Sequence, residues 1–542
     1  MVIPEVAGST HPPDEARPED ERAGRAGGNE PEPFRSILVP GEDTAEFIGP
    51  RESPGTFADL HLDDIIAAVT AGHTQYELEP FFQQRVDALP TIEYRHEVFR
   101  DLEAPAILDA IRSFARRMQQ VREQLVRAGK GRDRYEHDRW ILGAADAYCE
   151  AATGLAGDLA AAKPLSHGLR GLCDYLGAYL RSTAFVTLAS ELQEVKTGLA
   201  AVRYRLHFDE DRVTVARYDS EPDYGAEVLA AFEKFRQGAG KTYEFEFSNR
   251  PELNHVEAAV LDRVALLFPA VFSALDAFPA RHHGFLDPLL RRFDREIQFY
   301  IAYIELMARL ARRGLRFGYP TVTTVRGAVR ARDAFDLALA TRLADSGPAI
   351  VANDVTLDES ERMLVVSGPN QGGKTTFARM IGQLHHLAAL GVPVPGTEAR
   401  LPLVDGIFTH FERQESVEDL SSKLENDLRR IRDILEGATQ DSLLVMNESF
   451  SSTTLHDQLF INTEVVRAIL DRGCLCVAVT FLDELAALDP SIVSMVSKVD
   501  PDEPARRTFR IVRRPADGLA YAMALAEKHR LTYEGVRARM RS

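Results

Sequence analysis

The stretch GPNQGGKTT, residues 368–376, has the residue types and spacing that bind nucleotide phosphates. It satisfies the pattern G-x-x-x-x-G-K-[ST], with an apolar run, MLVVS, before it and a helical pattern after it. Backbone N–H groups and the helix N-terminus would surround the phosphates. Lys374 would reach the β- and γ-phosphates, and the Thr375 hydroxyl would bind Mg²⁺. The predicted nucleotide-binding residues are Gly368, Pro369, Asn370, Gln371, Gly372, Gly373, Lys374, Thr375 and Thr376.

A second stretch, SLLVMNESF at 442–450, is an apolar strand pattern that ends in polar residues. Glu448 would orient or deprotonate the attacking water, so Glu448 and Lys374 are the predicted catalytic residues. The position before Glu448 is normally an aspartate that supports the Mg²⁺ shell, and here it is Asn447. A neutral amide supports the ion less well than a carboxylate does. The predicted metal site is therefore Thr375, Asn447 and Glu448.

Composition limits the other classes of function. The chain has 542 residues, a net charge of -18 and four cysteines. The length predicts two to four domains, and the acidic balance argues against broad, non-specific binding of nucleic acid. Cys474 and Cys476 lie in the apolar run CLCVAVT, where filling the core is favoured over binding a metal. No apolar run is long enough to span a membrane, and we expect a reduced, cytoplasmic protein.

The pattern along the chain predicts a multidomain protein in three parts. Residues 1–55 are rich in Pro, Gly, Glu and Arg, and we expect a disordered tail there. Residues 56–333 have mainly helical patterns, broken by a β-hairpin around 202–218. Residues 334–542 alternate short apolar strands with helices, which predicts an α/β P-loop domain with a mostly parallel sheet.

Two long helices with apolar seams are predicted within the helical region. The first seam is Ile111, Phe114, Met118, Val121 and Leu125. The second, in a helix over about 286–313 that Gly314 would end, is Leu289, Phe293, Ile297, Tyr300, Ile304, Met307 and Ala311. Such helices could pack as coiled-coil, lever-like arms or belong to an ordinary helical bundle, and the sequence does not separate the two.

Several stretches together resemble the MutS family of ATPases over about 345–540. They are GPNQGGKTT, GVPVPGTEARLPLVDGIFTHF, SLLVMNES, STTLHD at 452–457 and DGLAYAMALAEKHRLTYEGVRARM at 517–540. The resemblance implies an ABC-type head that binds ATP and Mg²⁺ and forms a homodimer with two ATP molecules at the interface. By position in ESVEDLSSKLENDLRRIRDIL, Ser422 would contact the partner's nucleotide in trans. Asn370 would position the nucleotide within its own loop.

This sequence departs from the family pattern at several positions. Asn447 replaces an aspartate, and Phe481 replaces a histidine next to the nucleotide. Lys423 and Leu424 replace the residues that normally follow the signature serine. The aromatic expected upstream to stack on adenine aligns with Ile350. These departures affect hydrolysis more than nucleotide binding. Phe481 could still pack near the nucleotide, but it cannot hydrogen-bond a phosphate.

The resemblance also suggests biological roles. We expect a MutS-related branch that keeps the arms and the ATPase but lacks the mismatch-reading domain, and that binds double-stranded or structured DNA. The candidate DNA contacts are Arg291, Arg292, Arg295, Arg312, Arg313, Arg316, Arg326, Arg330 and Arg332. Solvated surface arginines are the simpler interpretation. The alternative function is an ATP-gated protein scaffold with no DNA role, or a weak or inactive ATPase that senses ATP.

Overall fold

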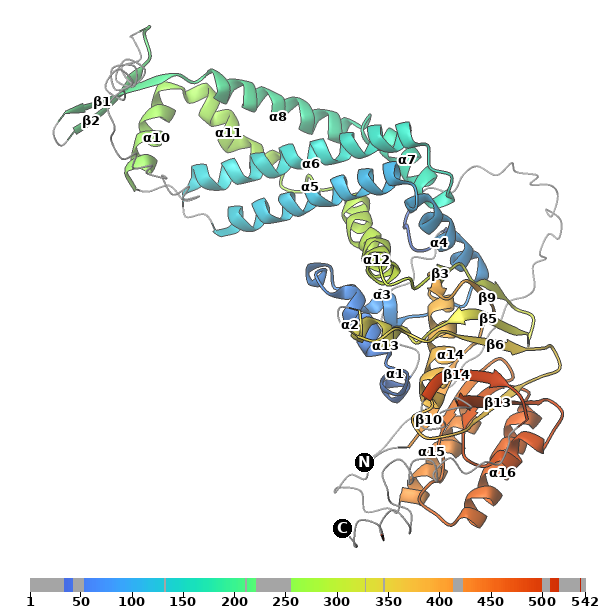
Figure 1. Cartoon of the computed structure of the whole chain (residues 1–542). Coiled ribbons are helices and arrows are strands. Elements are labelled where there is room, and N and C mark those ends of the chain that lie inside the picture. The colour runs from blue at the N-terminus through green and yellow to red at the C-terminus, as the bar shows by residue number, and fades with distance from the viewer. Residues whose placement is uncertain are drawn as a thin grey trace, which may run out of the picture.

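The computed structural model describes residues 34–41, 53–130, 133–209, 212–220, 255–326, 328–344, 347–412, 423–499, 507–515 and 537. A long helical arm extends from one end of the molecule, and the β-sheets gather at the other end (Figure 1). Between these two parts lie α4 (Leu89–Leu102) and α12 (Pro288–Ala311). The chain passes through this junction more than once, because helices that precede the arm in sequence pack beside helices that follow it.

The arm is a bundle of helices with a hairpin at its far end (Figure 1). Its elements are α5 (Pro105–Lys130), α6 (Arg134–Ala162), α7 (His167–Tyr179), α8 (Thr183–Ala201), β1 (Tyr204–Asp209), β2 (Arg212–Arg217), α10 (His255–Leu267) and α11 (Pro269–Arg281). The predicted seam of α5 is confirmed as the buried face, with Phe114 and Met118 each 1% exposed. The predicted hairpin is confirmed as well, because β1 and β2 pair antiparallel from Tyr204–Arg217 to Asp209–Arg212. Within the described ranges no single helix is long and apolar enough to cross a membrane, although the bent pair α10 and α11 would pass on length and composition if taken together.

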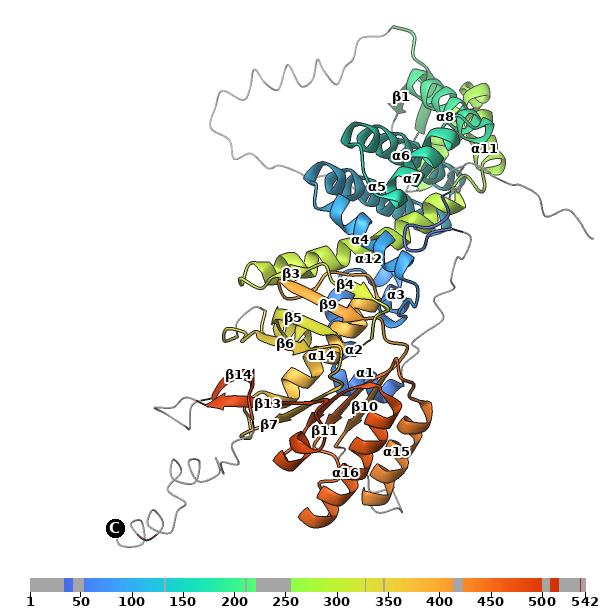
Figure 2. The ribbon, with the colours of Figure 1, turned by 90° about the vertical axis from the view of Figure 1, so that its right-hand side faces the viewer.

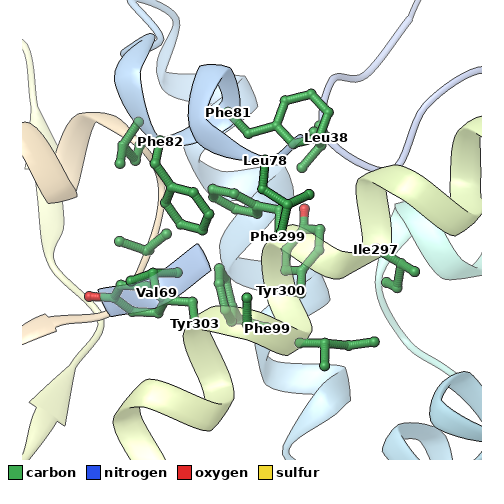
Figure 3. Close-up of a cluster of buried hydrophobic side chains, with 14 of the residues drawn as sticks. Leu38, Val69, Leu78, Phe81, Phe82, Phe99, Ile297, Phe299, Tyr300 and Tyr303 are labelled. Atoms are coloured by element: carbon green, nitrogen blue, oxygen red, sulfur yellow. The ribbon is translucent and has the colours of Figure 1, made fainter. Parts of the chain in front are cut away.

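The junction is an aromatic core around α12 (Figure 3). Phe82 stacks on Phe299 with ring centroids 4.7 Å apart, and Phe99 meets Tyr300 edge to face, also at 4.7 Å. Further members come from α2 (Leu62–Thr70), from α3 (Glu79–Gln83) and from the residues around η1 (Thr74–Tyr76). The preceding helix, α1 (Pro54–Leu60), lies nearer the main sheet. In the predicted seam of α12 the middle members Phe293, Ile297 and Tyr300 are buried. Leu289, Ile304 and Met307 are half-buried, and the last member, Ala311, is exposed.

The main sheet follows the order β10-β11-β12-β7-β13-β14, and all neighbours are parallel except β13 and β14. Its strands are β7 (Met363–Ser367), β10 (Ile407–Phe411), β11 (Leu443–Asn447), β12 (Leu475–Val479), β13 (Ile492–Val499) and β14 (Arg507–Arg513). Alternate residues of each strand face opposite sides. Leu444 and Met446 pack with α15 (Lys423–Gly437) and α16 (Leu455–Arg472), whereas Leu443 and Val445 belong to the core on the α14 (Lys374–Ala389) side.

A smaller sheet lies between α12 and the main sheet (Figure 2). Its order is β4-β9-β5-β6, and a short ladder β3-β8 lies beside it. Its strands and those of the ladder are β3 (Phe317–Gly318), β4 (Thr321–Thr323), β5 (Val329–Ala334), β6 (Asn353–Leu357), β8 (Val394–Pro395) and β9 (Glu398–Pro402). The short helix α13 (Leu337–Arg342) lies between β5 and β6 in the chain. A second short helix, η2 (Asp483–Ala487), packs near the main sheet. The boundary predicted between residues 333 and 334 therefore cuts β5, which pairs with β6 and β9 of the nucleotide-binding side.

The first helices after residue 53 also pack on the nucleotide-binding side rather than only in the helical region. The Thr56 hydroxyl donates to the carbonyl of Ile407, and the Gln383 amide donates to the carbonyl of Leu60. The part from 56 to 333 is thus not one separate structural unit. The sequence did not predict this, because the apolar pattern of a helix indicates that one face is buried but not which sheet or helix covers it.

Residues 34–41 correct the prediction of a continuous disordered tail over 1–55. Ile37 and Leu38 are 0% exposed. The Glu296 carboxylate accepts hydrogen bonds from the Ser36 hydroxyl and the Ile37 backbone N–H, and Tyr300 donates to the Ile37 carbonyl. We call residues 34–41 the strap. Its FRSILVP sequence is a short apolar island in a polar region, and α12 and α4 supply the partners for its backbone.

The strap should contribute to stability like any core segment. Leu38→Ala should lower the free energy of unfolding by about 2–5 kcal/mol, because it removes a fully buried leucine side chain. Val186→Ala, at a position 53% exposed on α8, should change it by less than about 0.5 kcal/mol. Urea unfolding followed by circular dichroism measures both. Equal, small effects would show that the strap is not part of the core.

Candidate functional site

The phosphate loop lies between β7 and α14, at the carboxyl edge of the parallel strands. Gly368 has φ 118° and Gly373 has φ 89°, which a residue with a side chain adopts only at a cost. Gly372 has no such angle, but a Cβ there would come within 2.4 Å of the Ser497 hydroxyl oxygen. The glycines thus let β13 approach the loop closely and leave its backbone free to surround a ligand.

A cavity of about 690 Å³ opens beside this loop. From the predicted site it is lined by Asn370, Gln371, Gly372, Gly373, Lys374, Thr375, Thr376 and Glu448. Gly368, Pro369, Asn447 and Phe481 are not among its lining residues. The opposite wall is more apolar and includes Leu339, Pro348, Ile350, Val351 and Phe509. The polar loop fits phosphates, and the apolar wall fits a base and sugar.

Lys374 is buried at the start of α14. Its ammonium donates to the carbonyls of Gly368 at 3.0 Å and Pro369 at 3.2 Å, and lies 4.2 Å from the centroid of the Phe481 ring. Burial is the largest influence on the pKa of Lys374 and lowers it, while the Glu448 carboxylate opposes part of this shift. Phe481 therefore contacts Lys374 by a cation–π interaction where a histidine could have offered a hydrogen bond.

Thr375 and Asn447 meet at the predicted metal position. The Thr375 hydroxyl donates to Oδ1 of Asn447 at 2.8 Å. Asn447 is the last residue of β11, where it pairs with Phe411 and Val479. The described residues contain no group of three or more His, Cys, Asp or Glu side chains placed to hold a metal. The set fits an ion such as Mg²⁺ that takes most of its ligands from phosphate and water.

Glu448 occupies a turn with unusual backbone geometry. Its φ is 52°, and its backbone N–H donates to the carbonyl of Val479 on the neighbouring strand β12. The residue lines the cavity on the phosphate-loop side. A carboxylate at this place can accept a proton from a water molecule beside the terminal phosphate.

One predicted residue lies outside the described part of the chain, and one residue was missed. Ser422 is not described, and its role in trans stays a prediction. Phe509, on β14, lines the cavity, is 47% exposed and has φ 56°. The side-chain amide of Asn353 holds its carbonyl at 3.1 Å. Phe509 offers the aromatic surface that Ile350 lacks. The only feature of the sequence that could have indicated it is a single aromatic residue in the stretch RTFRIVR.

Most of the arginines proposed for DNA make contacts within the chain. Arg295 donates to the carbonyls of Tyr76 and Glu77. Arg326 pairs with Asp441, and Arg330 and Arg332 lie 3.9 and 3.3 Å from Glu398. Arg313 donates to the carbonyls of Leu343 and Gly347 at 2.6 and 2.7 Å. These contacts favour structural roles for the residues concerned.

The two cysteines of the C-x-C stretch are core residues. Cys474 and Cys476 are both 0% exposed and belong to the apolar cluster under α15 and α16. Burial raises the pKa of the Cys476 thiol well above its ordinary value. A buried, neutral thiol is a poor metal ligand, which agrees with the sequence interpretation.

Comparison with known proteins identifies the domain around this site. Residues 364–528 match the family model for MutS domain V. The chain is 28% identical to the endonuclease MutS2 of Gemmatimonas aurantiaca over 289 residues, 53% of this chain and 32% of that protein. It is 31% identical to the endonuclease MutS2 of Thermus thermophilus over 190 residues, 34% of this chain and 25% of that protein. It is 28% identical to the DNA mismatch repair protein MutS of Thermotoga sp. (strain RQ2) over 170 residues, 31% of this chain and 21% of that protein. The matches thus cover between a fifth and a third of these relatives.

Because Asn447 contacts Thr375 at the predicted metal position, a carboxylate at position 447 should strengthen Mg²⁺ binding. Asn447→Asp should lower the Mg²⁺ concentration needed for tight ATP binding by about tenfold or more, because it adds a negative charge near the ion. Fluorescence titration with a labelled ATP analogue at several Mg²⁺ concentrations measures this. Binding in EDTA is the control, and it should not improve. An unchanged Mg²⁺ dependence would mean that position 447 does not face the ion.

Proposed function

We propose that the chain binds and hydrolyses ATP with Mg²⁺ through the region that matches MutS domain V. The observation that carries this proposal is that Lys374, Thr375 and Glu448 line one cavity, with Asn447 behind them on the Thr375 hydroxyl. Lys374 would neutralise the β- and γ-phosphates, Thr375 would hold the ion, and Glu448 would activate water. The bound Mg²⁺ would neutralise charge that develops on the phosphates.

We further propose that two copies dimerise through these domains. The segments after β11 and β12 begin at the same edge of the sheet, because the two strands are parallel, and they carry exposed apolar residues. Leu455 is 72% exposed, Phe460 is 65% exposed and Phe481 is 53% exposed. Large exposed apolar side chains that lie together are typical of a surface that another protein covers. In such a dimer Ser422 would reach the partner's nucleotide.

We propose DNA as the ligand of the arm side, on the strength of a second cavity. It measures about 1230 Å³, lies between η1, α5 and the start of α12, and is lined by Arg122, Arg291, Arg292 and Arg295. Arg122 contacts Asp294 and Tyr76, and Arg295 is bound to backbone carbonyls. Arg291 and Arg292 are exposed, and the carboxylate of Glu296 is 3.9 Å from Arg292. These two guanidinium groups are the best candidates for phosphate contacts.

The alternative function is an ATP-gated protein scaffold. The net charge of -18 and the internal contacts of most candidate arginines favour it. It predicts a protein partner that is recovered only with ATP and is lost with Lys374→Ala. DNA binding that depends steeply on salt would favour the first function instead.

The ATPase proposal predicts a clear separation of binding from hydrolysis. Lys374→Ala should abolish ATP binding, since it removes the phosphate cation. Glu448→Gln should retain ATP binding and lower kcat by about 10²–10⁴-fold, as expected for loss of a general base. Glu464→Gln is a matched control, because Glu464 lies on the surface of α16 and pairs only with Arg467 among the contacts described. Phosphate release measures turnover with and without linear, single-stranded and branched DNA. Turnover that survives Lys374→Ala would contradict the proposal.

The DNA proposal predicts an effect confined to two arginines. Replacing both Arg291 and Arg292 by alanine should weaken DNA binding and reduce the salt slope, log Kobs against log salt, by about 2. Replacing both Arg429 and Arg432, which pair with neighbours on α15, should leave the slope unchanged. Fluorescence anisotropy at several salt concentrations measures both. Equal slopes for the parent and the first double variant would remove these residues as DNA contacts.

A further inference from the structure

The turn that carries Glu448 is strained on both sides of Ser449. Glu448 has φ 52° and Phe450 has φ 59°, so two residues with side chains adopt left-handed conformations within three positions. Each such residue costs free energy and persists only where surrounding groups hold it. Glu448 lines the cavity beside the phosphate loop, and the turn sets where its side chain starts. The shape of the turn therefore depends on the groups that contact Ser449 and Phe450.

His410 is the central group among them. It lies on β10, is 1% exposed, and its Nδ1 is 2.9 Å from the Ser449 hydroxyl oxygen. Its Nε2 is 3.2 Å from the backbone carbonyl of Asp427 on α15. A carbonyl can only accept, so Nε2 carries a proton, and in the neutral ring the Ser449 hydroxyl donates to Nδ1. The ring also packs against Phe450, with centroids 5.4 Å apart.

The carbonyl of Ser449 is held from α16. The Gln458 amide donates to the Ser449 carbonyl at 3.1 Å, and Asn462 approaches the same carbonyl at 3.5 Å. Ser449 is thus bound through its backbone from one side and through its hydroxyl from the other. The hydroxyl contact is the one that reaches the neighbouring strand and α15.

We propose that His410 is a positioning residue for hydrolysis. It holds the strained turn so that Glu448 faces the nucleotide, and it does not touch the nucleotide itself. This inference rests on the proposed ATPase function. Loss of the imidazole lets the turn relax toward ordinary backbone angles, which moves the Glu448 carboxylate away from the attacking water.

The same contact gives the turn a connection to α15. That helix begins at Lys423, directly after the serine assigned to the partner's nucleotide. A second connection runs in parallel, because the Glu412 carboxylate accepts from the Ser451 hydroxyl at 2.7 Å and from the Lys423 ammonium at 2.6 Å. If α15 shifts on dimerisation, these contacts would therefore move the turn that carries the Glu448 carboxylate.

The test compares His410→Phe, His410→Gln and Ser449→Ala in the full-length protein. His410→Phe removes both hydrogen bonds, and kcat should fall by roughly tenfold to a hundredfold, because small misplacements of a catalytic group have effects of this size. ATP affinity should change less than about threefold, since the phosphate loop is untouched. His410→Gln keeps an amide that can bond Ser449, and it should restore part of the activity. Ser449→Ala should lower kcat without removing any ring packing.

His385→Phe is the matched control, since His385 is also buried, at 2% exposed, and lies on α14 with its Nδ1 on the carbonyl of Ile381. It should leave kcat within about twofold of the parent. Amide hydrogen exchange of residues 447–451 is the second measurement, and it does not depend on turnover. Exchange there should accelerate in His410→Phe and Ser449→Ala but not in His385→Phe.

The outcomes separate this inference from the proposed function. A parent protein that binds no ATP would remove the function, while exchange at 447–451 would still decide whether His410 holds the turn. Unchanged exchange and unchanged kcat in His410→Phe would overturn the inference. So would a fall in kcat matched by His385→Phe, or by an equal loss of ATP affinity, because either points to general destabilisation.

Discussion

A single buried arginine joins the parts of this molecule that sequence distance separates. Arg95, on α4, is 0% exposed. Its Nε donates to the carbonyl of Leu38 in the strap at 2.9 Å, and Nη1 donates to the carbonyl of Leu390, at the end of α14, at 2.7 Å. The guanidinium also lies 5.3 Å from the ring centroid of Phe299 on α12. A buried charge is costly, and these two hydrogen bonds offset part of that cost while they join the strap and the end of the phosphate-loop helix to α4.

The nucleotide site is the part of the structure that could be predicted most completely. Its residues are local in sequence, and the chemistry of phosphate binding prescribes glycines, a lysine and a hydroxyl at fixed spacing. The structure brings Thr375 and Asn447 to 2.8 Å although 72 positions separate them. The strand pattern predicted this, because parallel strands end at one edge of the sheet. Phe509 could not be found in the same way, since an isolated aromatic on an antiparallel edge strand has no pattern.

The strap and the domain boundary show why the rest was harder. Residues 1–55 are polar on average, and this average hides the short apolar segment FRSILVP. Composition therefore predicts disorder throughout, although the structure describes the eight residues 34–41. Their order depends on Glu296 and Tyr300, about 260 residues away, and no local rule contains that information. The boundary failed for a related reason. β5 resembles any short strand, and only its pairing with β6 and β9 assigns it to the nucleotide-binding side.

These contacts also suggest how the arm and the nucleotide site affect each other. α12 runs from the base of the arm toward the nucleotide-binding side (Figure 1). Near its end, Tyr303 donates to the carbonyl of Pro393 at 2.7 Å, just beyond α14. Just after its end, Arg313 binds the carbonyls of Leu343 and Gly347. Pro348 and Ile350, which follow directly, line the apolar wall of the cavity.

A helix held at both places cannot tilt without moving either the phosphate-loop helix or the wall that faces the base. Because packed interiors do not deform continuously, such a tilt would take the form of discrete arrangements. A ligand at either end that favours one arrangement would then change affinity at the other by the same factor.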